Sequence, residues 1–373
     1  MDLGLTEDQE MLKKVAADFV KAEVPAHQMT QWYKDKKIFR PELVKKAAEL
    51  GWLGMMLPEE WGGAGLAPMD CAVVFEQLGH GPVPGPLFTS GILSAQMIFE
   101  ACTDAQRKDL LPALCSGKSI VIPAITDKSA YWGPQAVETR LSKIPGGYLL
   151  NGTKRFVFDA DAATNFLSAA RTEEGKVVFL LVDAKASGIT VTQHTGFFVS
   201  VFEVRFNNVA VSADNLLGSS GASWATLEKA LDKALPILSA YQVGATQEVF
   251  DMTCEYTNSR VVFGQPIGRF QRVQDHCVDI SICLDTARWA TYEAIWRVEN
   301  GMDARAGVHE AKATASDGYY HGTNYAHMVW AGPGTDYSHP MMAHSVLAHT
   351  LYQYLGTPGH HKRLMIDALY PRA

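Results

Sequence analysis

Side chains that could accept a proton are scattered along the chain. The candidate acids are Glu76, Asp127 and Asp336. His339 and His344 are also candidates, because histidine changes its charge near neutral pH. A single histidine within a helical pattern is more often packed or solvated than catalytic. These five residues therefore remain open alternatives for acid–base chemistry, and none predicts a site by itself.

The histidines and cysteines do not have the spacing of a metal site. Successive C-terminal histidines are separated by five, five and eleven residues, whereas two ligands on one helix face need a spacing of four. The six cysteines show no metal-ligand or redox-pair spacing and are typical of reduced thiols in a cytosolic protein. We expect no metal. The histidines concerned are His339, His344, His349, His360 and His361.

The elements that must position these side chains follow a helical, β, helical order. Amphipathic helix patterns cover the first stretch, including a capping box at Thr6 and Gln9. Short apolar strands with turn residues between them follow, among them Asn151-Gly152 and Asn207-Asn208. Long helix patterns at 224–258, 271–300 and 308–329 predict an antiparallel bundle. We predict an α+β protein: a helical domain (1–118), a β-barrel or sandwich (119–218) and a helical bundle (219–373).

Composition excludes several classes of partner. The chain has 373 residues, is 47% hydrophobic and carries a formal net charge of -7 without a basic block, which argues against nucleic acid. No apolar run approaches the ~20 residues of a membrane-spanning helix. The N-terminal residues lack the pattern of a signal peptide. We therefore expect a cytoplasmic protein with no membrane partner.

Four local sequences resemble the acyl-CoA dehydrogenase family. They are LTEDQEML, LGWLGMMLPEEWGGAGL, YLLNGTKRFVFDADAATNFLSAAR and SRVVFGQPIGRFQ, the last at residues 259–271. The tail SVLAHTLYQYLGTPGHHKRLM resembles one branch of that family, the smaller subunits of heteromeric enzymes that act on steroid or dicarboxylic acyl-CoAs. The resemblance covers nearly the whole chain and implies an oxidoreductase that desaturates an acyl-CoA thioester with FAD.

The resemblance also implies two groups of cofactor residues. In such enzymes the flavin ring and substrate lie in one subunit, while a neighbouring subunit holds the ADP half of the FAD. Arginine suits the pyrophosphate because its planar fork can donate two charge-assisted hydrogen bonds. By resemblance, the residues toward the neighbour's ADP half are Arg260, Phe263, Gln271, Gly332 and Gly334, and those beside the chain's own flavin ring are Thr126 and Phe156.

The carboxylate base that the reaction needs is absent from both places where the family carries it. The family's Tyr-Glu-Gly-Thr turn is Tyr354-Leu355-Gly356-Thr357 here, and the alternative helix position holds Ala234. Asp232 lies ~200° around that helix, so it should point elsewhere. The loop at 126–133 lacks the family's Gly-Ser-Asp, and Phe158 replaces a hydroxyl beside the flavin. The catalytic residue is therefore unknown.

This division of retained and missing residues leads to a hypothesis about assembly. The chain would complete the FAD site of a homologous, base-bearing subunit in a heterotetramer, with acyl-CoA as substrate and an electron-transferring flavoprotein as electron acceptor. Two alternatives remain open: a homotetrameric enzyme with an atypical base or a non-standard elimination, and a non-catalytic scaffold. Retained Arg260 and Gln271 argue against the scaffold.

Overall fold

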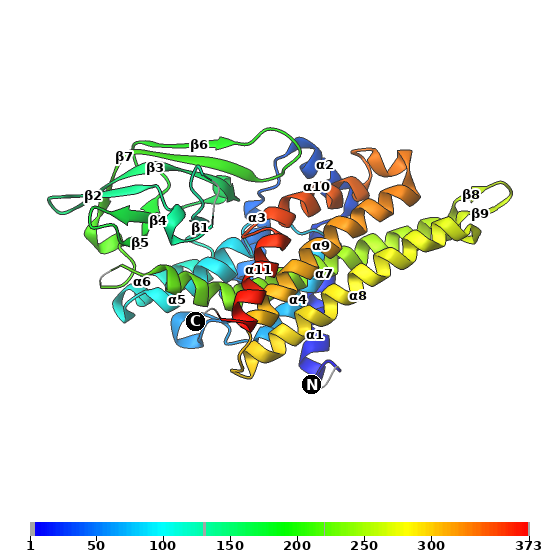
Figure 1. Cartoon of the computed structure of the whole chain (residues 1–373), viewed down its shortest axis with the longest axis horizontal. Helices are drawn as coiled ribbons and strands as arrows, with labels where there is room; N and C mark the ends of the chain where they lie inside the picture. The colour runs from blue at the N-terminus through cyan, green and yellow to red at the C-terminus, as the bar shows by residue number, and fades with distance from the viewer. Residues whose placement is uncertain (1–3, 130–131, 220, 372–373) are drawn as a thin grey trace.

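A computed structural model describes residues 4–129, 132–219 and 221–371. Ala130 and Tyr131, which belong to the loop at 126–133, lie outside the described residues. The predicted α+β order of helical domain, β domain and helical bundle is confirmed (Figure 1). None of the described helices is both long and apolar enough to cross a membrane.

The N-terminal part is helical and begins at the predicted capping box. Gln9 donates its backbone N–H to Thr6 Oγ1 at 3.2 Å, and Thr6 donates its backbone N–H to Gln9 Oε1 at 3.1 Å. The helices here are α1 (Glu7–Glu23), α2 (Ala26–Asp35), α3 (Pro41–Glu49), η1 (Glu59–Trp61), α4 (Pro68–His80), the π-helical η2 (Thr89–Ser94), α5 (Ala95–Ala101) and α6 (Asp104–Cys115).

The central part is one curled sheet of seven strands in the order β1-β4-β2-β3-β7-β6, with β5 paired to β4. Short 3-10 turns η3 (Pro134–Ala136), η4 (Ala160–Ala162) and η5 (Ala213–Asn215) connect or follow its strands. The strands are β1 (Val121–Ala124), β2 (Arg140–Ile144), β3 (Gly147–Phe158), β4 (Asn165–Thr172), β5 (Val177–Asp183), β6 (Ile189–Gln193) and β7 (Val201–Ser212).

Two predicted turns in this sheet were wrong. Asn151-Gly152 lies inside β3 and Asn207-Asn208 lies inside β7, at places where the pairing of these two strands is irregular. A Cβ atom at Gly152 would be 2.3 Å from the Thr139 hydroxyl, so this glycine permits a close approach of neighbouring strands. Asn208 has a positive φ of 50°, a conformation that asparagine tolerates within a strand irregularity.

The C-terminal part is a bundle of long helices that ends in a projecting hairpin. In Figure 1, α7, α8 and α9 run side by side, and the hairpin β8–β9 extends beyond them, far from the sheet. The elements are α7 (Trp224–Ser259), β8 (Val261–Val262), β9 (Gln265–Pro266), η6 (Ile267–Arg269), α8 (Gln271–Glu299), α9 (Arg305–Trp330), η7 (Gly332–Thr335), α10 (Pro340–Gln353) and α11 (Pro358–Leu369).

Candidate functional site

A cleft of about 920 Å³ lies between the sheet and the turn that joins α10 to α11. Thr126 and Phe156 line it from the sheet side, and Leu355 and Gly356 line it from the turn. The volume falls in the range of about 300–1,000 Å³ that is typical of small-molecule sites. The cleft therefore brings together the two residues predicted beside the chain's own flavin ring and the turn that lacks the expected acid.

Both expected base positions hold buried aliphatic side chains. Leu355 is 8% exposed and has a left-handed backbone with φ 60°, which costs a non-glycine residue roughly 1–2 kcal/mol. The His361 ring donates from Nε2 to the Leu355 carbonyl oxygen at 3.1 Å and helps to hold this turn. Ala234 is fully buried within α7. Neither side chain can accept a proton from a substrate.

Asp127, one of the candidate bases, forms a buried ion pair with Lys154 of the sheet. Lys154 Nζ donates to Asp127 Oδ2 at 2.8 Å and to the Ile125 carbonyl at 3.0 Å, and the Thr139 hydroxyl donates to the other carboxylate oxygen. Burial lowers the pKa of Lys154 to about 8, although the charge and hydrogen bond of Asp127 oppose that shift. Asp127 therefore serves the structure of the sheet.

Replacing Lys154 with methionine should destabilise the protein by about 3–5 kcal/mol, because it leaves a buried carboxylate without its partner. Urea unfolding followed by circular dichroism measures the loss. The double variant Lys154→Met, Asp127→Asn should recover more than half of it, since no unpaired charge remains. A double variant as unstable as the single one would show that the ion pair is not the cause.

The other two predicted acids are remote from the cleft. Glu76 on α4 accepts a 2.5 Å hydrogen bond from the Tyr292 hydroxyl and lies 3.6 Å from Arg288, both on α8. Asp336 follows η7 and accepts the backbone N–H of Ser338, which holds its pKa below the usual value. Neither residue lines the cleft, so the structure brings neither of them to Leu355.

The two predicted histidines are also engaged elsewhere. His339 precedes α10, accepts the backbone N–H of Met341 at 3.2 Å and packs against the Trp330 ring. His344 is fully buried, and its Nδ1 lies 3.0 Å from the Tyr319 hydroxyl. Burial lowers the pKa of His344 to about 4, which keeps its ring neutral. Both histidines are packing residues of the bundle.

Two acids near the cleft escaped sequence reasoning. Glu138 is the one acid among the described residues that line the cleft, and it lies exposed on the sheet side, just before β2. Asp159 directly follows β3 and is buried, with hydrogen bonds from the hydroxyls of Thr89 (3.1 Å) and Ser200 (3.0 Å). Burial, and then the charge of Asp161, raise the pKa of Asp159 to about 7. The sequence signal that could have identified Asp159 is its position directly after the strand pattern at 155–158, whose end lies beside the cleft.

A second cavity, next to the cleft, is very small. It has a volume of about 40 Å³, far below the size of a ligand site. Tyr354 lines both spaces, and the other walls of the small cavity come from α2, α4, α7, α10, the end of β3 and the residues around Gly85. Its aromatic lining residues are Tyr33, Phe75, Phe88, Phe158, Tyr241 and Tyr354. The chain's own rings thus fill the apolar space behind the cleft.

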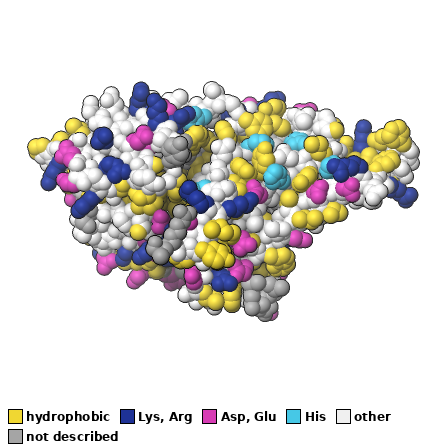
Figure 2. All heavy atoms as spheres, in the orientation of Figure 1, with side chains coloured by type: hydrophobic (Ala, Val, Ile, Leu, Met, Phe, Trp, Pro, Cys, Tyr) yellow, Lys and Arg dark blue, Asp and Glu magenta, His cyan; other side chains and the backbone are white. Residues whose placement is uncertain are grey.

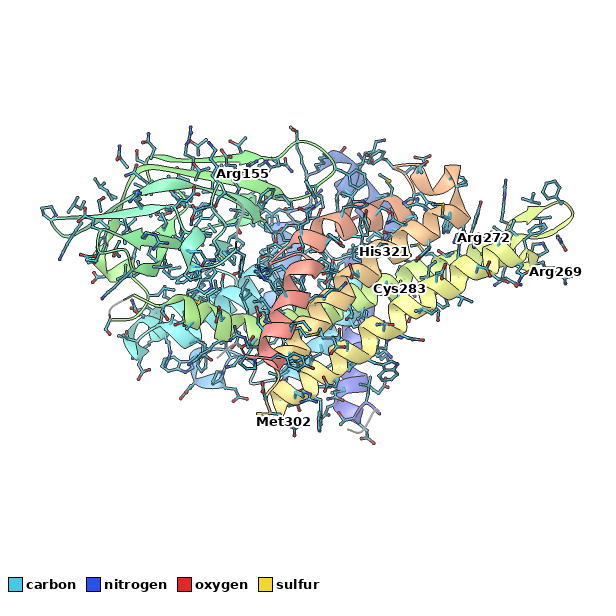
Figure 3. The ribbon with its side chains drawn as sticks, in the orientation of Figure 1. Arg155, Arg269, Arg272, Cys283, Met302 and His321 are labelled. Carbon is cyan, nitrogen blue, oxygen red and sulfur yellow. The ribbon has the colours of Figure 1, made fainter. Side chains whose placement is uncertain are left out.

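The residues predicted to contact a neighbour's cofactor lie at the opposite end of the molecule. Arg260 and Gln271 are exposed at the base of the hairpin, and Phe263 at its tip is 91% exposed. Arg269 and Arg272 lie beside them, as Figure 3 shows. Gly332 and Gly334 lie in η7, directly after the end of α9. In Figure 2 this end carries both apolar and basic side chains on the face shown.

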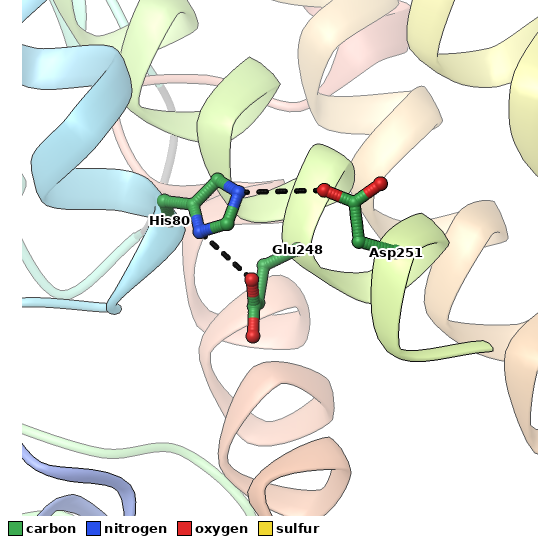
Figure 4. A group of neighbouring side chains, drawn as sticks. All are labelled: His80, Glu248 and Asp251. Atoms are coloured by element: carbon green, nitrogen blue, oxygen red, sulfur yellow. Dashed lines mark ion pairs between the residues drawn. The ribbon is translucent and has the colours of Figure 1, made fainter. Parts of the chain in front are cut away.

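A charged cluster of one histidine and two acids lies between α4 and α7 (Figure 4). His80 Nδ1 is 2.7 Å from Glu248 Oε2, and its Nε2 is 3.5 Å from Asp251 Oδ2. The three residues are close enough to hold a metal ion. Because each ring nitrogen already faces a carboxylate, we interpret the cluster as an ion pair that ties the two helices together.

This cluster predicts that stability declines as His80 loses its proton. Burial alone would lower the pKa of His80, but hydrogen bonds and charge from Glu248 and Asp251 outweigh it and raise the pKa. The stabilisation is therefore complete below the ordinary histidine pKa of about 6.5 and is lost as pH rises through the higher folded-state value. Urea unfolding between about pH 6 and 9 should show this decline. His80→Gln should flatten it, and an unchanged slope would exclude this role.

Comparison with known proteins assigns the chain to a family. The family model described as "Acyl-CoA dehydrogenase, N-terminal domain" matches residues 6–118, and "Acyl-CoA dehydrogenase, C-terminal domain" matches residues 221–370. Together they cover more than half of the chain. The chain belongs to the acyl-CoA dehydrogenase family. The family resemblance read from the motifs is confirmed at this level.

Individual relatives extend the similarity over almost the full length. The acryloyl-CoA reductase (NADH) of Anaerotignum propionicum is 28% identical over 352 residues, 91% of this chain and 89% of that protein. The structure titled "FAD complex of PigA" is 25% identical, covers 100% of both chains and has a TM-score of 0.91. The ChsE4-ChsE5 complex from Mycobacterium tuberculosis is also 25% identical over 100% of both chains, with a TM-score of 0.88.

The chain therefore has the fold of the acyl-CoA dehydrogenase family, and the structure places its predicted site residues in two regions. Its cleft is lined by Thr126 and Phe156, predicted by resemblance to lie beside the flavin ring, and by Leu355, in the turn where the resemblance places a glutamate. Arg260, Phe263 and Gln271, predicted by resemblance to contact a neighbour's cofactor, are exposed at the hairpin end. The two groups of residues lie at opposite ends of the molecule.

Proposed function

We propose that this chain is the base-lacking subunit of a heteromeric, FAD-dependent acyl-CoA dehydrogenase. Its exposed hairpin end holds the ADP half of an FAD whose flavin ring lies in a homologous, base-bearing partner. The observation that carries the proposal is the contrast between the two ends. Leu355 and Ala234 are buried and aliphatic, whereas Arg260, Phe263 and Gln271 are exposed at the surface of the single chain.

The hairpin end has the charge that a pyrophosphate requires. Arg260, Arg269 and Arg272 are exposed there. Helix α8 begins at Gln271 without a side-chain cap, so its first N–H groups and the positive end of its dipole face the same region. Arginine side chains beside a helix N-terminus suit phosphate oxygens. When bound, FAD supplies the hydride acceptor for desaturation, while this chain holds the phosphates in place.

The small volume of the second cavity also supports the proposal that the partner subunit, and not this chain, binds the substrate. A space of about 40 Å³ leaves no room for an acyl chain beside Tyr354 and Phe158. Restoring a carboxylate at position 355 would therefore not by itself create a substrate site in this chain. The acyl-CoA is bound and deprotonated in the partner, which the relative solved as a ChsE4-ChsE5 complex supports as a mode of assembly.

The proposal extends to the assembly as a whole. The chain and its partner form a heterotetramer, two copies of each, in the cytoplasm. Electrons leave the reduced flavin for an electron-transferring flavoprotein. The C-terminal bundle carries the contacts between subunits, since α8 exposes the apolar side chains Val278, Ile282 and Trp289 along one side.

A homomeric enzyme with an atypical base is the second candidate, and the open cleft favours it. A volume of about 920 Å³ can accept a ring system, and Glu138 is an acid within reach of that space. On this alternative, Glu138→Gln would abolish dehydrogenation by the chain alone. On the heteromeric proposal, the same substitution leaves the activity of the assembled complex within about twofold of wild type.

Expression with and without a base-bearing homologue tests the proposed function. The chain purified alone should carry little FAD and no acyl-CoA dehydrogenase activity. Co-purification with the partner should give a complex with flavin absorbance and activity. Flavin bound stoichiometrically to the chain alone, together with turnover of an acyl-CoA, would refute the proposal and support the homomeric alternative.

A further inference from the structure

Trp330, at the end of α9, is held between two other rings. It stacks on Tyr256 of α7 with a centroid distance of 3.9 Å and an angle of 11°, and it contacts the His339 ring in a tilted arrangement at 4.3 Å and 53°. Its indole Nε1 donates to the Thr253 hydroxyl at 3.2 Å. Trp330 is only 9% exposed, so stacking and a satisfied N–H fix it in one place.

This stack is connected directly to the hairpin. Arg260 donates its backbone N–H to the Tyr256 carbonyl at 2.9 Å, and Ile267 donates to the Arg260 carbonyl at 2.9 Å. Tyr256 is thus the last anchored ring before the chain leaves α7 for the exposed turn. A shift of the Tyr256 ring moves the backbone from which the Arg260 side chain extends.

The loop that follows Trp330 folds back closely against the end of α9. A Cβ atom at Gly334 would lie 2.7 Å from the Trp330 Cβ, so this turn requires a glycine at 334 with any side chain at 330. Gly332 has no atom within 4 Å of such a Cβ and carries no similar requirement. Ala331 has φ 52°, a conformation that favours glycine, and its N–H bonds to the His327 carbonyl at 2.8 Å. The η7 loop is therefore held close to the backbone of Trp330, beside the aromatic contacts of its ring.

We propose that Trp330 is a positioning residue for Arg260, the cofactor clamp that would bind the FAD pyrophosphate. Its contacts with Tyr256 and His339 hold the end of α7 and so set the direction of Arg260. The inference rests on the proposed function and adds a residue that touches no phosphate itself. Stacked rings suit this role because they resist tilting while leaving the arginine side chain free to reach its ligand. Trp330 joins α7, which leads into the hairpin, to the end of α9 and to His339 before α10.

The test compares Trp330→Leu with Trp330→Phe in the complex co-purified with its partner, with FAD titrated into the deflavinated complex as the probe. Trp330→Leu should weaken FAD binding about tenfold, the factor that corresponds to losing one good aromatic pair. Trp330→Phe should stay within about threefold of wild type, because a flat ring remains between its neighbours. Tyr256→Leu should match Trp330→Leu, and Tyr256→Phe is the matched control with normal affinity.

A near-ultraviolet circular dichroism spectrum and the thermal midpoint separate positioning from a merely structural role. Trp330→Leu should lose the aromatic signal of the stack while the complex stays assembled at the temperature of the titration, although its thermal midpoint falls because a buried ring is removed. Unchanged FAD affinity in Trp330→Leu, or a loss of assembly parallel to the loss of affinity, would overturn the inference. Arg260→Gln is measured alongside. If Arg260→Gln also leaves FAD affinity unchanged, Arg260 does not bind the FAD, and the proposed function fails together with the role of Trp330.

Discussion

Gly244→Ala is expected to leave the protein unable to fold stably. Gly244 lies where α7 crosses α4, and a Cβ atom there would be 1.7 Å from the Glu76 carbonyl oxygen. The contact is reciprocal, since a Cβ at Gly79 of α4 would be 1.9 Å from the Tyr241 carbonyl oxygen. Two backbones must separate to admit one methyl group, which should cost at least about 3 kcal/mol. Urea unfolding and soluble yield measure the effect.

Gly359→Ala is the matched control for this prediction. Gly359 lies in the first turn of α11, and the nearest atom to an added Cβ is 4.0 Å away. That substitution should be neutral or slightly stabilising, because alanine favours a helix more than glycine does. Equal stability of Gly244→Ala and wild type would show that the two helices do not approach as closely as described.

Arg260→Gln should remove most of the FAD from the assembled complex. A lost charge-assisted contact to a phosphate is worth about 1.5–3 kcal/mol, so the affinity should fall tenfold to a hundredfold. Glutamine keeps a polar side chain but is shorter and uncharged, so the substitution removes the charge, the fork geometry and part of the reach. The flavin-to-protein absorbance ratio after dialysis, and the dissociation constant for added FAD, measure the loss.

Arg140→Gln controls for a general loss of positive charge. Arg140 is exposed on β2 in the sheet, far from the hairpin in Figure 1, and should leave FAD content unchanged. Dehydrogenase activity of Arg260→Gln should be restored in part by excess FAD, because the partner's base is intact. Full FAD content in Arg260→Gln would exclude a clamp built on this residue.

The long helices were predictable because their patterns are strong and uninterrupted. The predicted segments at 224–258 and 271–300 correspond to α7 and α8 within one residue at each end. The sheet was harder, because glycine and asparagine have more than one structural use. Gly152 makes room for Thr139 within a strand, and the sequence pattern alone could not distinguish that from a turn.

The candidate site also has features that could be predicted from the sequence and features that could not. Leu355, Ala234 and Arg260 could be placed because each stands in a recognisable local frame. Other features could not be predicted, because each depends on contacts between segments that are distant in sequence. These are the ion pair of Lys154 with Asp127, the burial of Asp159 and the ring contacts of Trp330 with Tyr256 and His339. Distances between such segments are set by tertiary packing.

Electron cryo-microscopy of the chain assembled with its base-bearing partner and FAD tests the central claim most directly. We predict the pyrophosphate within hydrogen-bonding distance of Arg260 of this chain and the isoalloxazine ring in the partner's cleft, below a partner carboxylate. An isoalloxazine ring stacked in this chain's own cleft against Phe156, with one of its acids facing the substrate, would contradict the account.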